Sequence, residues 1–131
     1  MVDDESGSED FRIQVEVVDD SGRLLLDDPP YPEGLTRAIS LASDDAIIGH
    51  DVRRLEARVA VDDDEVIHAL HHAGYRREGR LRQARVRGNG WVDEYIYSRL
   101  ATDEIYTRTG HTGMLDSVLP TKRVISHVLL R

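Results

Sequence analysis

Three histidines on one predicted helix are the first residues whose spacing could support chemistry. His68, His71 and His72 stand at positions i, i+3 and i+4, so His68 and either of the other two would share one helix face. Neighbouring imidazoles can bind a transition metal. However, no carboxylate or further histidine is placed beside them by spacing, and the apolar stripe of the helix is complete without them. An exposed row of histidines is therefore the favoured interpretation, and we predict no metal site.

The next segment, residues 75–90, is the most basic part of the chain. It carries six arginines against the single acid Glu78, a local charge of +5 (six less one), whereas the whole chain carries −8. Arginines can bind the phosphates of nucleic acid or the 3′-phosphate of coenzyme A. Only Trp91, Tyr95 and Tyr97 could stack on bases, and the acidic balance opposes non-specific binding. We favour an exposed sheet face with Arg–Asp pairs and do not expect nucleic acid as a partner.

Proton transfer near neutral pH would require a carboxylate, a histidine or a tyrosine relay. Five residues are candidates by type alone, namely Glu16, Glu56, His50, Glu94 and Tyr97. Nothing in their spacing selects one of them, so the catalytic residue is left unknown.

Composition limits the class of protein. A chain of 131 residues fits one domain with a real core, and the absence of cysteine excludes disulfides, thiolate catalysis and cysteine zinc sites. No apolar run is long enough to span a bilayer, and the N-terminus is acidic where a signal peptide is basic. We therefore expect a cytoplasmic protein without a membrane partner.

The N-terminal part of the chain predicts a tail and a hairpin. Residues 1–10 are acidic and lack apolar periodicity, so we expect a disordered tail. Apolar alternation predicts strands at Phe11–Val18 and Arg23–Leu26, joined by a turn. The prolines within residues 27–32 then require a stiff loop.

The middle of the chain predicts helix, strand and helix. A helix is expected from Gly34 to about Ile47, and Gly49 ends it. Val52–Val61 alternates as a strand, and Asp62 or Asp63 then caps a second helix that stops at Gly74.

The remaining segments predict two more strands and a C-terminal extension. Residues 88–90 (Gly-Asn-Gly) suit a tight hairpin, after which Val92, Ile96 and Leu100 should share one buried face. We predict a loop at residues 107–113, one helical turn at 114–119 and a strand at Arg123–Leu130. The order of elements indicates an α/β or α+β domain over residues 11–104 with a mixed central sheet, and residues 105–131 form the extension.

Three segments in this order resemble the C-terminal half of a GNAT-fold acyltransferase, of the ribosomal-protein alanine N-acetyltransferase type. They are RLEARV (Arg54–Val59), ALHHAGYRREGRLR (Ala69–Arg82) and GWVDEYIYSRL (Gly90–Leu100), within a match over roughly Gly34–Leu100. The resemblance implies acetyl-coenzyme A as the cofactor and an amine as the acceptor. It also implies a GNAT-like mixed central sheet with two helices and a truncated N-terminal part.

The resemblance places the cofactor near one loop. The family holds the cofactor diphosphate with an Arg/Gln-x-x-Gly-x-Gly/Ala run at a helix N-terminus, and the matching segment here is residues 31–36. Tyr31 replaces the basic residue, Pro32 replaces the first glycine, and Glu33 adds a carboxylate. Asp63 matches an asparagine that contacts the pantetheine arm. The expected cofactor-binding residues are Gly34, Leu35, Thr36, Arg37 and Asp63.

Two functions stay open. The first is an acetyl-coenzyme A-dependent N-acetyltransferase acting on an amine. The second is a non-catalytic GNAT-derived module for dimerisation or regulation, or a fragment of a GNAT–Nudix fusion, because residues 113–131 resemble the lead-in to a Nudix domain without its metal-binding box. Too few residues precede the first strand to build the family's acceptor pocket. A partner, such as a second copy in a homodimer, could supply the missing part.

Overall fold

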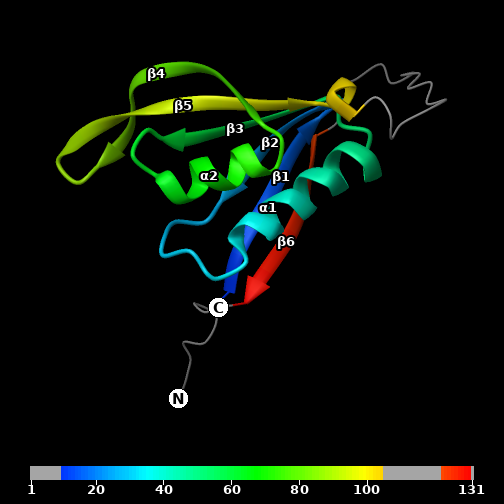
Figure 1. Cartoon of the computed structure of the whole chain (residues 1–131), viewed down its shortest axis with the longest axis horizontal. Helices are drawn as coiled ribbons and strands as arrows, with labels where there is room; N and C mark the ends of the chain where they lie inside the picture. Colours follow the sequence, from blue (N-terminus) through cyan, green and yellow to red (C-terminus); the bar gives the residue numbers. More distant parts are fainter. Residues whose placement is uncertain (1–9, 105–121, 131) are drawn as a thin grey trace.

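The computed structural model describes residues 10–104 and 122–130, which form one mixed sheet and two helices (Figure 1). The sheet order is β4-β5-β3-β2-β1-β6. The strands are β1 (Asp10–Val18), β2 (Ser21–Leu26), β3 (Arg54–Ala60), β4 (Arg76–Arg87), β5 (Gly90–Leu100) and β6 (Lys122–Leu130). The helices are α1 (Leu35–Asp44), continued by the π-helical turn η2 (Asp45–Gly49), and α2 (Asp64–His72), with a 3₁₀ turn η3 (Ala101–Glu104) after β5. The predicted fold class is confirmed.

β1 and β2 form the predicted antiparallel hairpin. Asp19 adopts a left-handed φ of 58° at the turn, a conformation that Asp tolerates better than most residues. Along β1 the side chains of Phe11, Ile13, Val15 and Val17 are buried, so alternation correctly identified the core face. Asp10, which the sequence places in the tail, begins this strand.

Helix α1 carries the chain from β2 to the parallel strand β3. Its buried side chains include Leu35, Ile39 and Ala42. The predicted end at Gly49 is confirmed, although the last turn is π-helical. A Cβ at Gly49 would lie 2.9 Å from Asp45 Oδ1, so only glycine fits there without a shift.

Helix α2 begins and ends as predicted. The Asp63 side chain caps it by accepting a hydrogen bond from the Val66 backbone N–H at 3.3 Å. Val66, Ala69 and Leu70 are buried, and Gly74 has a φ of 90° just after the helix. In the described part of the chain no helix is long and apolar enough to cross a membrane.

β5 is the strand predicted after the hairpin, but the prediction of its buried face was wrong. Val92, Ile96 and Leu100 are only half-buried, whereas Tyr97 and Arg99, of the opposite parity, are buried. Tyr97 pairs with Ala57 of β3 and therefore shares the face that the helices cover. The apolar pattern predicted the wrong face because a tyrosine and an arginine occupy core positions. Their polar ends form hydrogen bonds, which allows the rest of each side chain to be buried.

β6 lies beside β1 at the far edge of the sheet from β4, as Figure 1 shows. The predicted strand Arg123–Leu130 is confirmed, and it pairs antiparallel with β1 over nine consecutive residue pairs. The other predictions for the termini, at residues 1–9 and 107–119, lie outside the described residues, as does much of the Nudix-like segment.

Candidate functional site

A cavity of about 310 Å³ lies where β2 and β3 diverge. The two strands pair only from Ser21 with Arg54 to Leu24 with Ala57, although both continue further. The end of β2 stays with β1 instead, because Asp27 accepts a hydrogen bond from the Arg12 backbone N–H at 2.8 Å and its own N–H bonds the Arg12 carbonyl. The sheet is therefore open between β2 and β3.

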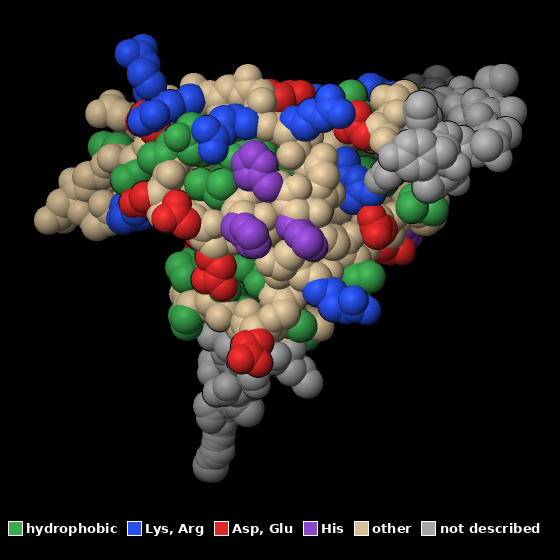
Figure 2. Space-filling model, in the orientation of Figure 1, with side chains coloured by type: hydrophobic (Ala, Val, Ile, Leu, Met, Phe, Trp, Pro, Cys, Tyr) green, Lys and Arg blue, Asp and Glu red, His purple; other side chains and the backbone are tan. Residues whose placement is uncertain are grey.

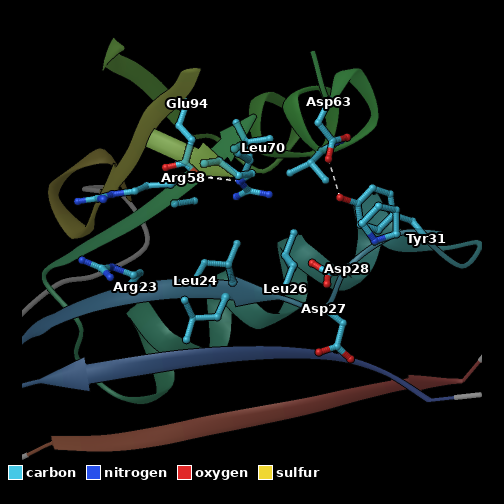
Figure 3. Close-up of a pocket in the computed structure, with 16 residues that line it drawn as sticks. Arg23, Leu24, Leu26, Asp27, Asp28, Tyr31, Arg58, Asp63, Leu70 and Glu94 are labelled. Atoms are coloured by element: carbon cyan, nitrogen blue, oxygen red, sulfur yellow. Dashed lines mark hydrogen bonds and ion pairs between the residues drawn. The ribbon is translucent and has the colours of Figure 1, made fainter. Parts of the chain in front are cut away.

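One side of the cavity is apolar. Leu24 and Leu26 of β2 line it together with Val66 and Leu70 of α2, and Figure 3 shows Leu26 and Leu70 on either side of the gap. Leu24 is 4% exposed and Leu70 is fully buried. This lining suits an aliphatic chain.

The opposite side of the cavity is charged. Glu94 of β5 is 7% exposed, and its Oε2 lies 2.8 Å from the Arg85 Nε. Arg23 and Arg58 also line this side (Figure 3). A buried carboxylate without a partner is strongly destabilising. The ion pair with Arg85 therefore offsets the cost of burying Glu94. Between Leu81 and Arg85 a register shift in β4 lets Arg85 face this carboxylate.

Tyr31 and Asp63 connect the loop before α1 to the start of α2. The Tyr31 hydroxyl donates a hydrogen bond to Asp63 Oδ2 at 2.5 Å, drawn as a dashed line in Figure 3. Burial raises the pKa of the Tyr31 hydroxyl well above its usual value, and the bond to Asp63 raises it further. The phenol therefore stays protonated and remains a donor at neutral pH.

The residues expected to bind the cofactor are divided between two places. Asp63 lines the cavity, but Gly34, Leu35, Thr36 and Arg37 do not. They form the N-terminus of α1, where Gly34 has a φ of 84° and provides no side-chain cap, and where the first turn contains no acid. Leu35 is buried, Thr36 is half-buried and Arg37 is exposed.

Of the five general-base candidates, only Glu94 lines the cavity. The hydroxyl of the buried Tyr97 accepts hydrogen bonds from Arg77 at 2.8 and 2.9 Å and lies 3.1 Å from His71 Nε2. Glu16 lies 3.2 Å from the Lys122 ammonium. His50 lies 3.5 Å from Asp45. Glu56 of β3 stands opposite Ser98 of β5 in the strand register, on the sheet face that the described helices leave open.

The three histidines of α2 and all the arginines of residues 75–90 except the half-buried Arg85 lie at the surface. His68, His71 and His72 are exposed on α2, where Figure 2 shows histidines gathered on the helix-covered face. No three possible metal ligands come together in residues 10–104 and 122–130. The expected Arg–Asp pairs are confirmed, with Arg80 2.8 Å from Asp93 and Arg87 2.5 Å from Asp62.

Sequence reasoning missed the arginines of the cavity. Arg23 and Arg58 are ordinary outward positions on their strands, and nothing local marks them as neighbours across a gap. Arg85 depends on an irregularity in β4, beside which Gln83 adopts a left-handed φ of 48°. Only the preference of that segment for arginine was visible in the sequence.

Comparison with known proteins identifies the fold. No protein-family model and no curated protein sequence matches the chain. A spermidine/spermine N-acetyltransferase from Vibrio cholerae, solved with manganese ions, is 19% identical, with a TM-score of 0.59 over 67% of this chain and 54% of that one. A GNAT-family acetyltransferase from Bacillus anthracis is also 19% identical, with a TM-score of 0.56 over 69% of this chain and 59% of that one. The chain has the GNAT acetyltransferase fold.

The chain spans little more than half the length of these structures. A dodecameric spermidine N-acetyltransferase from V. cholerae is 17% identical, with a TM-score of 0.59. The match covers 71% of this chain and 55% of the V. cholerae chain. The similarity at this identity concerns the fold.

Proposed function

We propose that this chain binds acetyl-coenzyme A between β2 and β3 and transfers the acetyl group to an amine. The observation that carries the proposal is the divergence of the two parallel strands, which leaves a cavity with one apolar and one charged side. The pantetheine arm would lie against the apolar side near Leu26 and Leu70. The charged side would be left for the acceptor.

The start of α1 would hold the diphosphate. The first backbone N–H groups of a helix have no partner within the helix, and the helix dipole favours an anion there. A Cβ at Gly34 would meet nothing within 4 Å, so the space beside Gly34 at this helix end is open. Thr36 is small, and the exposed Arg37 could add a positive charge. Asp63 would contact the arm from the start of α2.

The transfer itself needs no further cofactor. The amine nitrogen attacks the thioester carbonyl carbon, the C–N bond forms as the C–S bond breaks, and the proton lost by the nitrogen ends on the sulfur of coenzyme A. Glu94 is the candidate base that lines the cavity, on the side where the acceptor would enter. We therefore assign it as the first acceptor of that proton.

A second candidate function is a non-catalytic module with the same fold. Two observations favour it. The exposed Glu33 carboxylate directly precedes Gly34, where it would repel a diphosphate, and Pro32 offers no N–H. In addition, the Tyr31–Asp63 hydrogen bond already occupies the carboxylate expected to contact the arm.

Acetyl transfer to defined amines tests the proposal. The sequence resemblance favours a peptide with an N-terminal alanine, and spermidine is the acceptor to compare with it. We expect release of coenzyme A thiol with one of them. Leu26→Trp should fill the cavity and abolish release, whereas Val18→Trp, at an exposed β1 position outside the cavity, should leave it unchanged. Absence of transfer with either amine at millimolar cofactor would favour the non-catalytic module.

A further inference from the structure

The two edges of the sheet are built differently. β4 is irregular, with register shifts between Arg77 and Gly79 and between Leu81 and Arg85, and its arginines surround it with positive charge. β6 is regular over its whole length, because it pairs with β1 from Val18–Lys122 to Asp10–Leu130 without a shift. In the described part of the chain no strand pairs with its outer edge. Bulges and charges protect an edge strand from association, and β6 lacks the first of these.

The side chains of β6 are also suited to association. Val124 and Val128 are 52% and 54% exposed. They are paired with Glu16 and Arg12 of β1, so they lie on the sheet face that the described helices leave open. Ile125 and Leu129, on the other face, pack against the core. The strand is therefore anchored on one face and carries exposed valines on the other.

We propose that β6 pairs antiparallel with β6 of a second copy of this chain, about a two-fold axis at Ser126. This inference does not rest on the proposed function. In this register Val124 of each copy lies opposite Val128 of the other. Both exposed valines of each copy therefore contact the partner copy. Directly opposed side chains in an antiparallel pair have Cβ atoms about 5 Å apart, close enough for the valines to pack. An isologous contact of this kind closes on itself as a dimer.

The distribution of charge favours association of two copies through β6, and it favours the antiparallel direction. The only charged residues of β6, Lys122 and Arg123, lie at one end of the strand, and Lys122 is 3.2 Å from Glu16 of its own chain. Antiparallel pairing sets the two basic ends about 27 Å apart, at about 3.4 Å per residue. Pairing through β4 would instead bring two rows of arginines together. A second copy therefore fits the β6 edge better than any other described edge.

Mass measurements on charged variants test the edge and the register. By light scattering after gel filtration, we expect the unmodified chain to have twice its monomer mass at about 100 µM, a concentration at which a modest interface is populated. Val124→Lys with Val128→Lys would place like charges opposite one another and should give monomers. Val124→Lys with Val128→Glu should restore the dimer, since opposite charges then meet across the axis. Val86→Lys, at a 62% exposed position on β4, is the matched control.

A single cysteine tests the axis directly. The chain contains no cysteine, so Ser126→Cys introduces one thiol per copy. At the axis the two Cα atoms would be about 5 Å apart, within the range for a disulfide, and oxidation should cross-link the dimer nearly completely. Arg82→Cys on β4 should cross-link far less. A monomeric mass for the unmodified chain, a dimer or larger assembly that survives the lysine pair, or equal cross-linking of the two cysteine variants would overturn the proposal.

Discussion

The region from β3 to β5 and the region around the cavity differ in how fully their groups are paired. In the first, Leu55 is completely buried between paired strands, and the buried Arg99 guanidinium bonds Asp44 and the Ala73 carbonyl. In the second, β2 leaves β3 after Leu24, and α1 begins without a side-chain cap. Open hydrogen-bonding groups and a cavity reduce stability but make binding possible. The first region stabilises the fold, and the second contains the cavity in which we propose that the cofactor binds.

The largest expected effect is a loss of free energy of unfolding that differs between the two regions. Leu55→Ala should lower the free energy of unfolding by about 2–5 kcal/mol, because Leu55 is fully buried and the truncation leaves a cavity. Leu26→Ala, at the existing cavity, should cost about 1 kcal/mol or less, since its side chain is only partly buried. Urea unfolding measures both. Equal losses would remove the distinction between the regions.

The next effect concerns the start of α1. Thr36→Glu places a carboxylate in the first turn, where it stabilises the helix but repels a diphosphate, and we expect affinity for acetyl-coenzyme A to fall about tenfold or more. Ser40→Glu, one turn further along α1, is the matched control and should bind as the unmodified chain does. Calorimetric titration measures both. If the two variants bind equally well, the diphosphate does not lie at this helix end.

Acid should weaken the β3–β5 region through Glu78. Hydrogen bonds from Arg54 and from Ser98 hold the pKa of Glu78 at about 2, below its ordinary value of 4.5. Because the folded pKa is the lower one, the stabilisation is complete above pH 4.5 and is lost as the pH falls towards 2. The stability difference between the unmodified chain and Glu78→Gln should therefore shrink over that range. A difference independent of pH would show that the carboxylate charge does not contribute.

The smallest expected effect is a gain in affinity for acetyl-coenzyme A. Glu33→Gln removes the carboxylate that precedes Gly34, and we expect acetyl-coenzyme A to bind a few-fold more tightly at low salt, with the gain reduced by screening at high salt. The exposed position of Glu33 leaves stability unchanged. Affinity that is equal at both salt concentrations would place the diphosphate beyond the reach of this charge.

Local signals predicted most of the elements. Alternation identified β1 and β3, and Asp63, Gly74 and Gly88 were recognised as cap and turn residues because each has a local physical role. The position of β6 beside β1 could not be predicted, since strand pairing across more than a hundred residues leaves no local pattern.

The site was predicted less completely than the fold. Asp63 lines the cavity, but its contact with the cofactor, like the binding role of Gly34–Arg37, stays a prediction. The Arg85–Glu94 pair at the cavity depends on an irregularity in β4 that no periodicity reveals.

The central claim is that the opening between β2 and β3 binds acetyl-coenzyme A, and a melting curve at increasing cofactor concentration tests it most directly. A ligand that binds only the folded chain adds about 2.7 kcal/mol at one hundred times its dissociation constant, which corresponds to about 10 °C for a domain of this size. We predict a melting temperature that rises with the logarithm of acetyl-coenzyme A concentration in the unmodified chain and not in Leu26→Trp. No rise at millimolar cofactor would contradict the claim.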